Sequence, residues 1–133
     1  MLPLFFLAAF FLQDNASDLD SMQGEWKILE GSRRGDPWPK EELAKMKFIV
    51  KKNNFILDDG VHRPTPAILL LNEEKTPREF RLKVRGGRKG EFLLGIYQLK
   101  KDHLKICWSE PGEERPGDHE PKAKRFSLFM TRK

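Results

Sequence analysis

Cys107 and His103 are the side chains whose types suggest nucleophilic or metal chemistry. A thiol beside an imidazole can act as an activated nucleophile, and both groups can ligate zinc. Here they stand four positions apart in a segment with the alternation of a β-strand, and an extended chain separates such side chains too far for either role. We therefore predict no catalytic pair, no metal and no cofactor, and we interpret Cys107 as a small packing residue.

Acidic side chains gather in residues 110–121, a stretch rich in proline and glycine. Grouped carboxylates can form acid–base pairs or bind calcium, but the spacing of an EF-hand is missing, and so is a helix that would fix a pair. We interpret this segment as a solvated loop that crosses one end of the domain. Arg115 is its best candidate for binding, because a guanidinium at the mouth of a barrel could clamp a carboxylate or phosphate. The alternative for Arg115 is a structural salt bridge to a neighbouring carboxylate.

A basic stripe is formed by Arg81, Lys83 and Arg85, and Arg88 and Lys89 extend it. A basic strand face is a typical footprint of a nucleic acid or an anionic polymer. The apolar and aromatic residues of this strand fall on its opposite face, so the platforms on which bases stack are missing. The missing platforms argue against a nucleic-acid partner. A protein or an envelope polymer remains as the possible partner of the stripe.

The segments that must position these side chains are eight short strands and one helix. Apolar runs and alternation predict strands at residues 25–31, 46–52, 54–58, 66–72, 79–85, 91–99, 103–109 and 124–131. Pro39 and the acidic residues that follow it favour a helix at residues 40–45. Because hairpins with short links recur, we expect an all-β fold: an eight-stranded antiparallel up-and-down barrel with one short helix after the first strand.

The 133 residues have room for one domain, and a hydrophobic content of 38% supports a single modest core. Residues 2–12 form an apolar run, which is shorter than the roughly 20 residues of a membrane-spanning helix and suits a secretory signal. We therefore expect a leader at residues 1–17, a domain at residues 18–133, and export to the periplasm or medium with no membrane span after leader removal. A buried N-terminal helix is the alternative for this run. The net charge of +5 mildly favours anionic surfaces.

Four short motifs follow one another along the domain. They are Leu19-x-x-x-Gln23-Gly24-x-Trp26-Lys27, Pro39-x-Glu41-Glu42-Leu43, Leu94-Gly95-Ile96-Tyr97-x-Leu99 and Leu104-Lys105-Ile106-Cys107-Trp108-x-x-Pro111-Gly112-x-x-Arg115-Pro116. Together they resemble a family of small lipocalin-like domains that is abundant in Planctomycetes and has no established activity. The resemblance covers about residues 18–132, implies a calycin-type barrel that is commonly exported, and supplies no reaction. The chain departs from the family at residues 117–121, so the mouth of the barrel is expected to differ.

The resemblance also implies how the barrel closes, because in lipocalin-like barrels the first-strand tryptophan is covered by a basic side chain of the last strand. Arg132 shares strand parity with the apolar residues of the last strand, and this parity brings it toward Trp26. Gly24, Trp26 and Arg132 are therefore predicted to be structural, with Arg125 as the alternative partner of Trp26.

The first functional hypothesis is a non-enzymatic exported domain that binds a small apolar or amphipathic ligand inside the barrel. The candidate lining residues are Phe48, Val50, Phe80, Leu82, Ile106, Trp108 and Phe126. The alternative is a solidly packed barrel that meets a protein or envelope polymer through its loops or its basic strand face. Interior volume separates the two hypotheses, because a ligand needs a cavity of about 300 Å³ or more.

Overall fold

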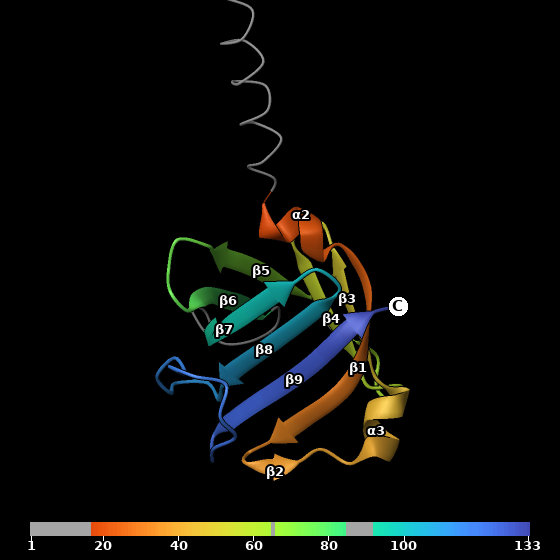
Figure 1. Cartoon of the computed structure of the whole chain (residues 1–133). Helices are drawn as coiled ribbons and strands as arrows, with labels where there is room; N and C mark the ends of the chain where they lie inside the picture. The colour runs from red at the N-terminus through yellow and green to blue at the C-terminus, as the bar shows by residue number, and fades with distance from the viewer. Residues whose placement is uncertain (1–16, 65, 85–91) are drawn as a thin grey trace, which may run out of the picture.

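The computed structural model describes residues 17–64, 66–84 and 92–133, and these residues form an antiparallel β-barrel with two short helices (Figure 1). In chain order the elements are α2 (Asp18–Met22), β1 (Gly24–Arg33), β2 (Asp36–Pro37), α3 (Lys40–Lys45), β3 (Lys47–Lys51), β4 (Asn54–Asp58), β5 (Ala67–Asn72), β6 (Arg78–Val84), β7 (Phe92–Lys100), β8 (His103–Ser109) and β9 (Arg125–Arg132). The predicted strands and the predicted helix at residues 40–45 are all present.

The barrel closes because β1 pairs on both sides. Its first residues pair with β3, and most of its length pairs with β9, while β3 to β9 follow one another in chain order. This is the up-and-down arrangement of eight antiparallel strands that the sequence predicts, with α3 as the short helix after β1. The two-residue strand β2 was not predicted; it pairs with the end of β1, where the sequence indicates only a turn.

A β-bulge interrupts β1. The pairing with β9 shifts register between Ile28 and Glu30, so one residue on β1 has no opposite residue on β9. A bulge of this kind moves all later side chains of the strand to the other face of the sheet. As a result Ser32 points outward, opposite Ser127 of β9, although it lies four residues after the inward-facing Ile28.

The helix α2 covers one end of the barrel (Figure 1). The Ser17 side chain caps it by accepting a hydrogen bond from the Asp20 amide at 3.2 Å, and Met22 is buried in the core. Gly24 follows with a φ of +114°, a conformation that is easy only for glycine and that turns the chain from the helix into β1. We call α2 the plug. The motif at residues 19–27 therefore contains most of the plug and the start of β1, and only the strand was predicted.

Candidate functional site

The interior of the barrel is filled by side chains. The predicted lining residues Phe48, Val50, Phe80, Leu82, Ile106 and Trp108 are buried and Phe126 is half-buried, and all belong to one packed cluster. The space left along the axis has a volume of about 10 Å³, between Met22, Phe48, Phe55, Leu69, Leu71, Phe80, Tyr97, Leu104 and Ile106. Such a void holds about one water, whereas ligand sites measure roughly 300–1,000 Å³. The interior is therefore a core.

The closed end of the barrel has the geometry that strand parity predicts. The Arg132 guanidinium lies 4.4 Å from the centre of the Trp26 ring, and Trp26 is 1% exposed. Arg132 also donates to the backbone carbonyls of Gln23, at 3.0 Å, and of Ser21. The Trp26 indole N–H donates to the Met22 carbonyl at 2.9 Å. One cation thus joins the last strand, the first strand and the end of α2.

A second anchor of α2 was not predicted from the sequence. The Asp18 carboxylate accepts hydrogen bonds from the Tyr97 hydroxyl at 2.7 Å and from the Arg78 guanidinium at 2.5 Å, and the Asp18 amide donates to Glu73 at 2.8 Å. Burial and the bond to Asp18 raise the pKa of Tyr97 far above its ordinary value. Three residues distant from α2 in sequence therefore hold the plug, and of these only Tyr97 stands in a motif that the sequence singles out.

Aromatic side chains pack together near the opposite end of the barrel. Trp108 stacks on Phe126 with ring centres 5.4 Å apart, and Trp38 lies against Phe126 at 6.4 Å. Arg33 covers Trp38, and both donate to the Glu42 carboxylate of α3, at 3.3 Å and 2.9 Å. Trp108 and Phe126 are thus core contacts.

Arg115 lies on the outer wall of the barrel, and its predicted position at the mouth is corrected. It donates to the carbonyls of Gly95 at 3.1 Å and Phe80 at 3.3 Å, and it forms a 3.2 Å ion pair with Glu79. These contacts tie the loop to β6 and β7, so the alternative of a structural salt bridge describes this residue.

The reason for the correction is the course of residues 110–121, which we call the strap. It runs over the outer wall of β7 and β8, where the outward-facing Ile96, Cys107 and Ser109 are each at most 2% exposed. The Ser109 hydroxyl donates to the Glu114 carbonyl at 2.5 Å, and Arg125 binds Asp118 at 2.9 Å. The strap therefore does not cross one end of the barrel, as its composition suggested, but buries a second small core outside it.

Cys107 and His103 lie on the same outer face of β8 but in different surroundings. Cys107 lies in the small core, where burial raises the pKa of its thiol to about 11. His103 stacks on Phe129 with ring centres 5.6 Å apart, on the exposed part of the same strand. The described residues also bring together no group of three or more His, Cys, Asp or Glu side chains that could hold a metal.

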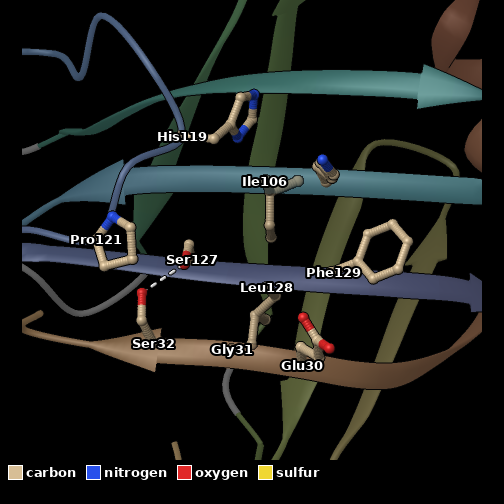
Figure 2. A pocket seen from close by; sticks show the side chains of 10 residues that line it. Glu30, Gly31, Ser32, Ile106, His119, Pro121, Ser127, Leu128 and Phe129 are labelled. Atoms are coloured by element: carbon tan, nitrogen blue, oxygen red, sulfur yellow. Dashed lines mark hydrogen bonds between the residues drawn. The ribbon is translucent and has the colours of Figure 1, made fainter. Parts of the chain in front are cut away.

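A pocket of about 220 Å³ lies between the strap and the outer wall. Figure 2 shows His119 and Pro121 of the strap facing β1, β8 and β9 across it. At its end the Ser32 and Ser127 hydroxyls bond to each other at 2.5 Å. Burial, and then the charge of Lys105, lower the pKa of His119. The pocket thus offers an imidazole, a lysine and the Glu30 carboxylate, and its two hydroxyls already bond to each other.

The basic stripe is the remaining predicted feature, and its described members Arg81 and Lys83 are exposed on the outer wall. Arg85, Arg88 and Lys89 lie outside the described residues. Strand register places Arg81 between Leu70 and Leu94, and Lys83 between Ile68 and Phe92. We call these six residues the β5–β6–β7 face. A hollow of about 270 Å³ lies at the edge of this face and is lined by Leu70, Arg81 and Arg115, among others.

No helix among the described residues is long and apolar enough to cross a membrane. Comparison of the chain with protein-family models, with curated proteins and with solved structures gives no match.

Proposed function

We propose that the protein is an exported, non-enzymatic interaction module, a solid barrel that binds a partner protein through the β5–β6–β7 face. The observation that carries this proposal is the filled interior, which leaves about 10 Å³ where a ligand-carrying barrel needs a cavity. Export rests on the apolar run at residues 2–12. The candidate lining residues then stabilise the fold, and binding takes place outside it.

The chemistry of the β5–β6–β7 face favours a protein partner with acidic and apolar side chains. Leu70 is 36% exposed, and Ile68, Phe92 and Leu94 are half-buried beside the two cations. The Arg81 guanidinium lies 5.1 Å from the centre of the Phe92 ring, which fixes its position. Aromatic and arginine side chains set among aliphatic ones are typical of protein interfaces, and an acidic partner complements the net charge of +5.

Photocrosslinking in the cells that make the protein tests this face. With Leu70 replaced by a photoreactive phenylalanine, we expect a discrete protein adduct. The adduct is expected to disappear when Arg81→Glu and Lys83→Glu are added, because the partner is acidic. Val61, which is 75% exposed in the β4–β5 loop, is the matched control position and should give no such adduct.

Two outcomes would overturn the proposal. One is an adduct at Leu70 that persists after both charge reversals, and the other is the same adduct from the Val61 position. A separate measurement addresses the interior: native mass spectrometry of the protein from its own cells should show no small molecule bound to it. A co-purifying small molecule at one per chain would favour ligand carriage.

A further inference from the structure

A second surface lies on the outer wall of β7, β8 and β9, beyond the strap. Register places Gln98, Lys105 and Phe129 side by side in one row, and Lys100, His103 and Thr131 in the next. Phe129 is the aromatic centre of this surface. His103 stacks on it with an interplanar angle of 5°, and the Lys105 ammonium lies 5.5 Å from its ring centre.

These side chains line a hollow of about 250 Å³, made by Gln98, Lys100, His103, Lys105 and Phe129. A second hollow of about 650 Å³ adjoins it, shares Gln98 and Lys100 with it, and reaches Lys75 on the β5–β6 loop and Gly117 on the strap. Lys105 and Phe129 also line the pocket of Figure 2. Because they share these lining side chains, the three hollows are neighbours on the outer wall, and we call them together the groove.

The charges of the groove favour an anionic ligand. Its central hollow is lined by two lysines and a histidine, and none of the described residues that line it is acidic. Acidic groups at the margins have other contacts: Glu73 accepts from the Asp18 amide, Asp118 binds Arg125, and Asp102 lies 3.7 Å from Arg132. Glu30 lies opposite Phe129 and limits the groove on the β1 side.

We propose that this groove binds an acidic polysaccharide, a chain of sugar rings that carry carboxylates or sulfates. A ring packs against Phe129, its anionic groups meet Lys100 and Lys105, and the Gln98 amide bonds to hydroxyl groups. Lys100 and Lys105 are diagonal neighbours on paired strands, about 7–8 Å apart at the backbone, so adjacent anionic groups on one chain can reach both. This site goes beyond the proposed function and uses a different face.

Two other acidic polymers fit the groove less well. An extended peptide binds best to an unpaired strand edge, but β8 and β9 pair on both sides along these rows. Only the last three residues of β7, 98–100, have no partner on β6, which is a short edge for a peptide strand. Single-stranded nucleic acid needs a series of stacking platforms, whereas the central hollow has one phenylalanine and one histidine.

The test is a titration of the full chain, labelled for NMR, with a glucuronate tetrasaccharide. We expect amide shifts on β7, β8 and β9 and weaker binding at high salt. Lys100→Ala with Lys105→Ala should lower the affinity about tenfold or more, and Phe129→Ala should also lower it. Lys40→Ala with Lys45→Ala is the matched control, because it removes the same charge from the exposed surface of α3 and should change little.

Each other outcome overturns the proposal. If a neutral tetrasaccharide binds as tightly as the glucuronate tetrasaccharide, the anionic groups do not contribute to binding. Inorganic sulfate that binds as tightly leaves a simple anion site, and a tetraglutamate peptide that binds as tightly indicates an acidic peptide. If both lysine double variants lose the same affinity, binding depends on net charge alone. If no probe shifts any amide signal, there is no site on this wall. Arg81→Glu with Lys83→Glu should leave this binding unchanged, so the two faces are tested separately.

Discussion

Asp18 joins the plug to the barrel wall through three hydrogen-bond partners. Its side chain is 14% exposed, and it accepts from one charged and one neutral donor. Asp18→Asn keeps the shape but removes the charge, and we expect a loss of about 1.5–3 kcal/mol in the free energy of unfolding, measured by urea denaturation. Asp20→Asn, in the same helix but exposed, is the control. Equal stability of the two variants would contradict a role of Asp18 as an anchor.

Cys107 is expected to be unreactive in the folded protein. The strap covers its thiol, and burial raises its pKa from 9.0 to about 11, so the thiolate is scarce near neutral pH. Alkylation at pH 8 should be much slower than in the unfolded chain. The unfolded chain also loses this proton at lower pH than the folded one, so the contribution of Cys107 to stability falls as pH rises from 9 to 11. Rapid labelling of the native protein would refute this burial.

Single residues differ in how well the sequence predicts them. The contact of Arg132 with Trp26 follows from strand parity, because parity decides which side chains of a strand share a face. The bond between Tyr97 and Asp18 does not follow, because it depends on which segments meet at the end of the barrel. The position of Arg115 was wrong for a related reason: an isolated cation takes its place from the course of its loop.

At the scale of elements, alternation of apolar side chains located the strands of the barrel, since each strand has one face toward a common core. The bulge in β1 leaves no trace in that pattern, because it is defined by the register against β9. The strap was predicted as a solvated loop because its prolines, glycines and charges lack periodicity. Its few buried contacts come from single residues such as Pro116.

The close packing of the paired strands β6 and β7 gives a prediction at this scale. Gly95 pairs with Phe80, and a Cβ on Gly95 would overlap the Phe80 ring and lie 2.6 Å from the Cys107 carbonyl. Gly95→Ala should therefore destabilise the protein by about 1–3 kcal/mol, through overpacking that thermal or urea unfolding can measure. Gly117→Ala is the matched control, since its Cβ meets nothing within 4 Å. If the Gly95→Ala variant is as stable as the unmodified protein, β6 and β7 pack less closely than described.

For the whole molecule, the sequence predicted a barrel but did not decide between a hollow and a filled interior. The same inward-facing aromatic residues suit either state, because what differs is the sum of their volumes against the space that the strands enclose. Here Phe48 and Phe55 pack edge to face, 4.6 Å apart, and Met22 of the plug fills the closed end. The filled axis moves the expected binding from the interior to the outer wall.

The most direct test of this account is a methyl-detected NMR titration of the full chain with dodecanoate, an apolar probe that a hollow barrel would admit. Because the axis has about 10 Å³ of free space, the methyl signals of Leu82, Leu104 and Ile106 should not move. The melting temperature should also stay constant. Saturable shifts of these interior methyls at one probe per chain, together with a higher melting temperature, would contradict the solid barrel and restore ligand carriage.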